Sequence, residues 1–268
     1  MHARSPTGIA GRIRRLVLDE SRRANVGHIG CSLSVADILA ALYGGALRTT
    51  DGDPDRDRFV LSKGHAGLAL YAALEATGRL PEGAVSQYCG DGTMLGVHPE
   101  HALPGVDFST GSLGQGLSMG VGAAVAARMQ GSSRRTFVLM SDAELNEGSI
   151  WEAAMFAAHH GLGSLVLLVD LNGQQALGYT KDVLDLEPVA PRFEAFGWDV
   201  REVDGHDVSA IAGVLASLDT EGGTPHVVLA RTTFGKGVPY MHGRIEWHYL
   251  PLSEQQYREA VAVVEPLG

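Results

Sequence analysis

Residues 135–174 read RTFVLMSDAELNEGSIWEAAMFAAHHGLGSLVLLVDLNGQ, and this stretch decides the fold. An apolar run at 137–140 leads into Asp142, and a second apolar run at 165–169 leads into Asn172. The segment between them has helical spacing, so the pattern predicts a strand, a helix and a second strand. Two parallel strands joined by a helix bring their carboxyl ends to one edge of a sheet, which is where such sheets bind ligands.

Asp142 and Asn172 would each offer a side-chain oxygen at that edge. Taken alone, both residue types are common in turns for purely structural reasons. Because each follows an apolar strand here, we expect their side chains to converge on one point. Carboxylate and amide oxygens suit a hard divalent cation that carries a phosphate group, so the pattern predicts such a site.

Strands and helices alternate along most of the chain. Apolar runs at 59–62, 198–203 and 226–230 predict further strands. Periodic segments predict helices at 9–24, 35–44 (capped by Ser34), 68–77, 117–129, 189–196, 208–218 and from about 253. This alternation predicts an α/β fold, a doubly wound and mostly parallel sheet with helices on both faces. We expect a flexible tail over residues 1–8 and a single domain over residues 9–268.

The bulk composition narrows the classes of function. The chain has 268 residues, of which 45% are hydrophobic and 19% charged, and this balance supports a large core. Its net charge of −10 argues against a nucleic-acid partner. No apolar run approaches the roughly 18 residues of a membrane helix, and the start lacks the apolar core of a signal peptide. Cys31 and Cys89 form no CxxC motif, so we expect a reducing, cytoplasmic location.

Four histidines occupy glycine-containing loops, namely His28, His65, His98 and His248. Each one alone is more often structural than functional. Histidine titrates near neutral pH and can accept or donate a proton there. Four of them in comparable loops, in a chain with a predicted cation site, indicate proton-transfer chemistry.

Two further features are open to structural or functional interpretation. The loop at 110–116, TGSLGQG, opens a helix and could present N–H groups to an anion or a ring, although helix packing explains it equally well. The helix it opens, 117–129, is hydrophobic all round, so we expect it to be buried or to lie at a subunit interface. Glu147 could stabilise a helix start or relay a proton.

Six motifs, in order, make nearly the whole chain resemble the amino-terminal, thiamine-diphosphate-binding half of transketolase. The resemblance is strongest to the A-type, cofactor-binding chain of split transketolases. The motifs are NVGHIGCSLSVADIL (25–39), SKGHAG (62–67), GVHPE (96–100), TGSLGQG (110–116), SDAELNEGSIWEAAMFAAHH (141–160) and DLNGQQ (170–175). Their combination is far more specific than any one of them.

The resemblance implies a role for each matching residue. Asp142 and Asn172 would bind Mg²⁺ or Ca²⁺ through their side chains and Gln174 through its backbone carbonyl, with Asp170 supporting the loop. The metal would hold the diphosphate of thiamine diphosphate. The residues implied to contact this cofactor are His65, Gly111, Ser112, Leu113, Asp142, Ala143, Glu144 and Asn172.

The implied catalytic residues are the four loop histidines and one glutamate: His28, His65, His98, Glu147 and His248. His28 and His98 would face the substrate and assist proton transfer. Glu147 would lie at the subunit boundary and communicate with the partner's active site. His242 competes with His248 for its role, because the carboxyl-terminal region aligns loosely.

The resemblance implies transfer of a two-carbon ketol unit from a ketose or ketose phosphate to an aldehyde. In this family the cofactor lies between two domains. We therefore expect the second domain to be a separately encoded C-terminal subunit in an α2β2 assembly. Two alternatives remain, a component of a thiamine-diphosphate 2-oxoacid decarboxylase or dehydrogenase, and a non-catalytic assembly partner. The presence of both His28 and His98 favours transketolase.

Two positions depart from the family pattern. Ser141 and Ala143 flank Asp142 where the family usually has glycines, which permit unusual φ values and close backbone approach. Because Asp142 itself is present, we expect metal-dependent cofactor binding to persist. Met94 stands where relatives often carry a basic residue, which suggests an acceptor other than the usual sugar phosphate.

Overall fold

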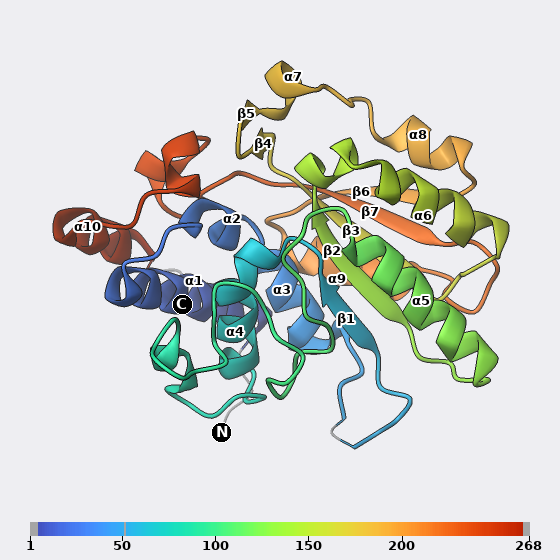
Figure 1. The fold of residues 1–268 in the computed structure, drawn as a ribbon, viewed down its shortest axis with the longest axis horizontal. Coiled ribbons are helices and arrows are strands. Elements are labelled where there is room, and N and C mark those ends of the chain that lie inside the picture. Colours follow the sequence, from blue (N-terminus) through green and yellow to red (C-terminus); the bar gives the residue numbers. More distant parts are fainter. Residues whose placement is uncertain (1–4, 51, 265–268) are drawn as a thin grey trace.

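Five parallel strands form the central sheet, in the spatial order β1-β2-β3-β7-β6 (Figure 1). Their bounds are β1 Arg58–Leu61, β2 Thr136–Ser141, β3 Leu165–Leu171, β6 Asp199–Asp204 and β7 His226–Arg231. The coordinates are a computed structural model that describes residues 5–50 and 52–264. The predicted strand–helix–strand unit is confirmed, since β2 and β3 are parallel neighbours.

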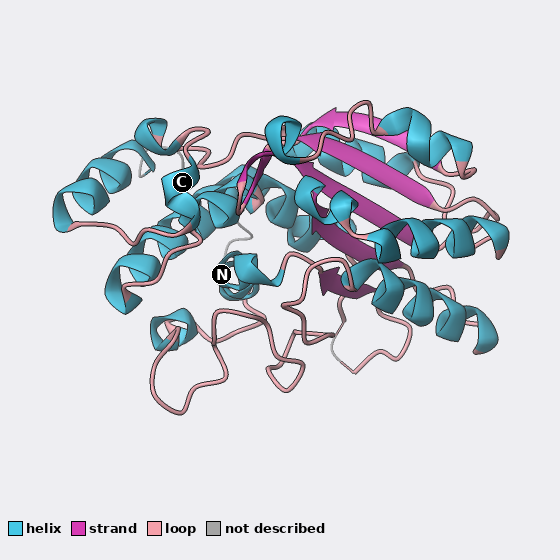
Figure 2. Ribbon diagram, turned by 45° about the horizontal axis from the view of Figure 1, so that its top comes forward, coloured by secondary structure: helices cyan, strands magenta, loops and turns pink. Residues whose placement is uncertain are grey.

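Helices cover both faces of the sheet, as predicted (Figures 1 and 2). Successive residues of a strand point to opposite faces, so Phe137 and Leu139 enter one core and Val138 and Met140 enter the other. The first core is covered by α1 Pro6–Ala24, α3 Ala36–Ala41, α4 Gly67–Ala76 and α9 Val208–Ser217. The second is covered by α5 Gly116–Met129, α6 Gly148–His159 and α8 Ala190–Ala195.

The remaining elements lie around the carboxyl ends of the strands or pack on α1. A two-stranded antiparallel hairpin follows β3, and a short helix follows the hairpin. These elements are α2 Ile29–Ser34, β4 Gln174–Gln175, β5 Gly178–Tyr179, α7 Thr180–Val183 and α10 Glu254–Val264. The hairpin and α7 were not predicted, because segments this short carry no measurable periodicity.

The first helix begins three residues earlier than predicted. The side chain of Ser5 accepts a hydrogen bond from the Gly8 N–H, and Pro6 occupies the first helical turn. Both features favour a helix start. Residues 5–8 therefore belong to the cap and first turn of α1, and the predicted tail is left only with residues 1–4, which lie outside the described range.

The segment around Ser34 also differs from the prediction. The predicted loop at 25–30 ends at His28, because α2 already begins at Ile29. The predicted helix at 35–44 is shorter, and α3 is followed by a π-helical turn at Leu42–Ala46. Ser34 does not cap that helix, because its hydroxyl lies 2.8 Å from Oδ2 of Asp170 in β3. A long-range partner has replaced the local one.

Helix α5 is buried on one side only in this chain, so of the two predicted alternatives, full burial is wrong and a place at a subunit interface stays a prediction. Leu117, Val121 and Ala124 face the sheet, whereas Met129 is 83% exposed. The small residues serve close packing, because Gly120 lies directly against Val138 of β2.

None of the helices within residues 5–50 and 52–264 has the length and apolar character that a membrane-spanning helix needs.

Two glycines of α5 provide a matched pair of substitutions. A Cβ added to Gly120 would lie 2.4 Å from Cγ2 of Val138, whereas one added to Gly122 meets nothing within 4 Å. We expect Gly120→Ala to lower the free energy of unfolding by about 1–3 kcal/mol through overpacking. Gly122→Ala should raise it by roughly 0.5–1 kcal/mol, because alanine is the better helix former. Urea unfolding of both variants would measure this, and equal effects would contradict the packing of α5 described above.

Candidate active site

Asp142 and Asn172 meet at the carboxyl end of the sheet. Ser141 pairs with Asp170 in the β2–β3 register, so the residues that follow these strands emerge side by side. Oδ2 of Asp142 accepts a hydrogen bond from the Gly173 N–H (2.7 Å), and both Asp142 and Asn172 line one pocket. The convergence predicted from the two strand ends is therefore present.

The chemistry of these groups suits a hard cation. Burial, and then the neighbouring charge of Asp170, raise the pKa of Asp142 to about 7. The positive charge of Lys63 offsets this only in part, so a bound cation would stabilise the ionised carboxylate further. Within residues 5–50 and 52–264 no three His, Cys, Asp or Glu side chains gather as a metal site. The candidate ligands are instead the oxygens of a carboxylate, an amide and a backbone carbonyl.

The non-glycine residues beside Asp142 cause no backbone strain. Ser141 has an extended conformation with φ −93° and ψ 159°. Ala143 is not among the described non-glycine residues with positive φ, which are Asn25, His28 and Cys89. Neither position therefore needs the conformational freedom of glycine. Ala143 also donates its N–H to Oδ1 of Asp142 (2.9 Å).

Three of the predicted histidines form one cluster beside the strand ends. The ring centroids of His28, His65 and His248 lie 5.3–5.5 Å from one another. His98 lies next to the glycine-rich loop, where a Cβ on Gly111 would be 3.3 Å from its ring. His28 enters the cluster with φ 60°, in the left-handed region.

Burial changes the charge state expected of these rings. It lowers the pKa of His28, with the neighbouring His98 acting in the same direction. It holds the pKa of His65 well below the usual value, helped by Lys63, and lowers the pKa of His248 to about 4. These three rings are therefore neutral at neutral pH, and for them the pKa lies below the range expected of a loop histidine. A neutral imidazole has one nitrogen that donates and one that accepts a hydrogen bond.

The cluster has hydrogen-bonding capacity that the protein does not use. The Nδ1 atoms of His28 and His248 are buried and have no partner among the described residues. Buried polar atoms are normally paired, so such orphans suggest a missing partner. The glycine-rich loop approaches closely, since a Cβ on Gly64 would lie 2.8 Å from the Gly111 nitrogen. These features fit a polar group bound between the histidines and the loop.

His248, and not His242, lies within the histidine cluster. His248 is buried and its ring is stacked on Phe234 at 6.0 Å between centroids. His242 is exposed, in the turn before it. The geometry therefore favours His248 over His242, the competing residue in the loosely aligned carboxyl-terminal region, as the fourth predicted histidine.

Glu144 supports the site and does not face it. Its side chain is fully buried, and its carboxylate accepts hydrogen bonds from the N–H groups of Gly114 (3.0 Å) and Ser141 (2.9 Å) and from the hydroxyl of Ser62. These bonds tie the glycine-rich loop to the ends of β1 and β2. All of its acceptor capacity is directed to the protein, so direct contact with a cofactor would require these bonds to change.

The other predicted residues lie on the surface or at its margin. Ser112 and Leu113 are exposed on the glycine-rich loop, and Leu113 is 39% exposed. Glu147 is exposed at the start of α6, where its Cβ packs against Gly114. Gln174 is buried, and neither atom of its side-chain amide has a partner among the described residues. Its backbone carbonyl remains the group of interest.

Sequence reasoning missed Lys63. Its side chain is completely buried and forms an ion pair with the equally buried Asp170, directly behind Asn172. Burial alone would lower the pKa of this amine, but Asp170 raises it, so the pair stays charged. A lysine directly after a buried strand was the signal that could have indicated a buried ion pair. It stands in the SKGHAG motif, in which the sequence analysis considered only His65.

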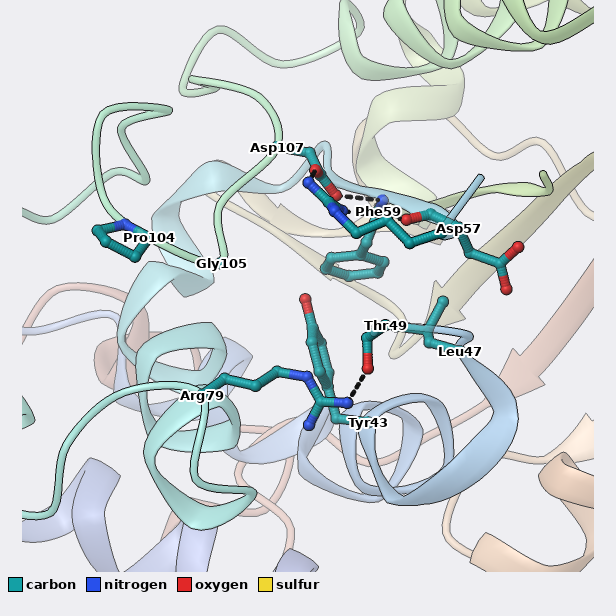
Figure 3. A pocket seen from close by; sticks show the side chains of 10 residues that line it. Tyr43, Leu47, Thr49, Asp57, Phe59, Arg79, Pro104, Gly105 and Asp107 are labelled. Atoms are coloured by element: carbon teal, nitrogen blue, oxygen red, sulfur yellow. Dashed lines mark hydrogen bonds and ion pairs between the residues drawn. The ribbon is translucent and has the colours of Figure 1, made fainter. Parts of the chain in front are cut away.

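A second pocket lies near the amino end of β1, away from the carboxyl ends of the strands where the candidate site lies (Figure 3). Its acidic groups are already matched by arginines: Asp107 by Arg56, and Asp57 by Arg48 and Arg135. None of the predicted site residues lines it. It is separate from the candidate active site.

Comparisons with known proteins agree with this geometry. The family model described as "Transketolase, thiamine diphosphate binding domain" matches residues 6–263. The chain is 42% identical to one of the subunits of the apulose-4-phosphate transketolase of Phocaeicola vulgatus, over 94% of this chain and 90% of that one. It is 40% identical to 6-deoxy-6-sulfo-D-fructose transketolase subunit SqwG of a Clostridium species, over 96% of this chain and 94% of that one.

Solved transketolases share the fold. The enzyme from Campylobacter jejuni matches with a TM-score of 0.89 and 31% identity over 97% of this chain. The enzyme from Leishmania mexicana matches with a TM-score of 0.89 and 31% identity over 98% of this chain. The chain spans only 42% of the length of either solved protein. On these matches the chain belongs to the transketolase family, as a member built on its thiamine-diphosphate-binding domain.

Proposed function

We propose that this chain is one subunit of a split transketolase that moves a two-carbon ketol unit from a ketose or ketose phosphate to an aldehyde. The observation that carries the proposal is the cluster of three partly to fully buried histidines near the Asp142–Asn172 pair, since Lys63 lies close enough to act on both His65 and Asp142. The relatives named as transketolase subunits support it, because they match this chain along almost their whole length.

In this proposal Asp142 and Asn172 bind Mg²⁺ (or Ca²⁺) through side-chain oxygens, and Gln174 adds its backbone carbonyl. Thiamine diphosphate, when bound, supplies the nucleophilic carbon and the electron sink for cleaving the ketose. The chain's own task is to neutralise the diphosphate and to orient the cofactor. Three neighbours complete the cofactor contacts, namely Gly111, Ser112 and Leu113.

The histidines hold and move protons around the substrate. His28 and His98 would face it, His65 would contact the cofactor, and His248 would complete the cluster with His28 and His65. Because burial lowers the pKa values of His28, His65 and His248, each of these three rings can be neutral, donate one hydrogen bond to a hydroxyl or phosphate oxygen and still accept a proton. A charged histidine could only donate.

The site requires a partner to close it. Several large apolar side chains near its open edge are exposed: Leu113, Leu177, Tyr179, Leu184, Tyr249 and Leu250. Exposed apolar side chains gathered in one region are typical of interaction surfaces. We propose that a separately encoded C-terminal-type subunit covers them, in an α2β2 assembly with Glu147 at a subunit boundary.

Three finer points complete the proposal. The two relatives are named for different sugars, so the donor and acceptor are specified here only as sugars or sugar phosphates. Residues 9–268 act as a single cofactor-binding domain. Both cysteines are free thiols, which fits a reducing compartment such as the cytoplasm.

Reconstitution tests the proposal directly. The purified chain should show no ketol transfer alone and should gain it when combined with a transketolase C-terminal-type subunit encoded beside it. A coupled assay with a ketose phosphate donor and an aldehyde acceptor measures this, with pyruvate as the control donor. Turnover by the chain alone, or turnover of pyruvate only, would overturn the proposal.

Loss of a metal ligand should abolish cofactor binding. Asp142→Ala removes the only carboxylate of the proposed metal site. Changes around metal ligands already cost about 10–100-fold in affinity, so loss of a ligand should exceed that. Calorimetric titration of the assembled enzyme with thiamine diphosphate and Mg²⁺ measures the effect. Asp182→Ala, at an exposed position of α7, is the matched control. Equal affinities for the two variants would contradict the assignment.

The neutral histidines make stability depend on pH. In the unfolded chain a histidine binds its proton near pH 6.5, whereas His248 in the folded chain does so at about 4. The unfolded state therefore binds more protons between these values, and the free energy of unfolding falls as the pH falls from about 6.5 to 4. One such histidine contributes at most about 1.4 kcal/mol per pH unit.

His248→Gln should therefore show a shallower pH dependence than the wild type. Urea unfolding of the isolated chain between pH 7 and pH 5 measures the slope. His159→Gln, at an exposed position of α6, is the control and should keep the wild-type slope. If His248→Gln also kept it, the buried neutral state of His248 would be wrong.

A further inference from the structure

The completely buried carboxylate of Asp170 lies at the centre of a hydrogen-bond network whose other members are buried or partly buried. Oδ2 accepts from the Lys63 ammonium, and it lies 2.8 Å from the Ser34 hydroxyl. Oδ1 accepts from the Thr232 hydroxyl. Lys63, Ser34 and Asp170 are inaccessible to solvent. The donors come from three separate segments of the chain, so the network forms only in the folded protein.

This network reaches the proposed metal ligand. Nδ2 of Asn172 donates to Oδ2 of Asp170 (2.7 Å), and Oδ1 of Asn172 accepts from the Gln174 N–H (2.9 Å). The amide is thereby fixed in one of its two orientations. The reverse orientation would turn Oδ1 toward the carboxylate and Nδ2 toward another N–H, and both contacts are repulsive. A metal needs the oxygen, so the orientation decides whether Asn172 can act as a ligand.

We propose that Lys63 is a positioning residue for the metal–diphosphate site, which acts on Asn172 through Asp170. The buried ammonium holds the carboxylate as an ionised acceptor at one place. The carboxylate in turn holds the Asn172 amide with its oxygen directed away from the network. Lys63 itself is bonded to Asp170 and need not touch the metal or the diphosphate. The inference rests on the proposed function of this same site.

The charges support this interpretation. Asp170 and Lys63 are both completely buried and form an ion pair. A buried carboxylate without a partner is strongly unfavourable, and Lys63 is the cation that this pair supplies. Asp170 thus remains an acceptor without drawing on the metal's charge.

A double-mutant cycle tests the relay. Lys63→Met, Asp170→Asn and the double variant are each assembled with the partner subunit and titrated with Mg²⁺ and thiamine diphosphate in a calorimeter. We expect Lys63→Met to weaken Mg²⁺-dependent binding by about 10–100-fold, as is usual for residues behind metal ligands. In the Asp170→Asn background the same change should have almost no further effect, because the relay is already broken.

Two results would overturn the inference. Lys63→Met with wild-type affinity would remove Lys63 from the site. An equal loss in both backgrounds would mean that Lys63 acts on the diphosphate directly through its charge. A wild-type assembly without any Mg²⁺-dependent binding would instead remove the proposed function itself, so the two failures are distinguishable.

A control separates positioning from general destabilisation. Arg135→Met removes one cation from the fully buried Asp57 near the amino end of β1 and should leave cofactor affinity unchanged. If Lys63→Met does not fold, Thr232→Val tests the same carboxylate, because it removes one donor and no charge. Weaker Mg²⁺-dependent binding is expected, and unchanged affinity would overturn the relay. The loss in Lys63→Met should appear as a higher Mg²⁺ concentration needed for half-maximal cofactor binding, and raising the Mg²⁺ concentration should restore that binding.

Discussion

The parallel register of β2 and β3 is the constraint on which the rest of the structure depends. Because Ser141 pairs with Asp170, the residues that leave the two strands emerge at the same height. Asp142 and Asn172 then meet without any further adjustment of the chain. β1 and β7 lie on either side of this pair of strands, so the turn carrying Lys63 and His65 and the segment carrying Thr232 are brought to the same edge.

The buried carboxylates at the two ends of the strands differ in the number of positively charged partners they have. Asp57, near the amino end of β1, is matched by two arginines and leaves nothing for a ligand. At the carboxyl edge, Lys63 matches one carboxylate, and Asp142 is left with backbone N–H groups only. The two carboxylates, of Asp57 and Asp142, are both buried but differ in their partners, and this difference supports the cation site proposed at Asp142.

Burial also explains why the histidines behave as a group. The three rings lie close to one another, and His65 and His248 also lie near Lys63, so protonating a ring would place positive charge in a poorly solvated cluster. The cluster stays neutral as a consequence. Neutral rings suit a substrate rich in hydroxyl groups, since each hydroxyl can donate to one ring and accept from another.

Much of the protein was predictable from the chain alone. The apolar runs identified four of the strands, because burial on both faces of a parallel sheet imposes continuous apolar runs, and the period of the apolar residues identified most helices. β6 was also predicted, although this edge strand has no buried residue and contains Asp199, Arg201 and Glu202. The motifs identified the family, and with it Asp142, Asn172 and the loop histidines. Element ends were less accurate, as at Pro6 and Ile29, because caps and short turns depend on local contacts.

Contacts between distant segments decided the remainder. The sequence could not choose between His242 and His248, could not show that Glu144 supports the glycine-rich loop, and contained no sign that Ser34 and Lys63 meet Asp170. Nor could it reveal that Ser141 and Ala143 fit without strain. Each of these depends on which groups share a buried space, and a side chain's pKa, orientation and partners arise only when that space is formed.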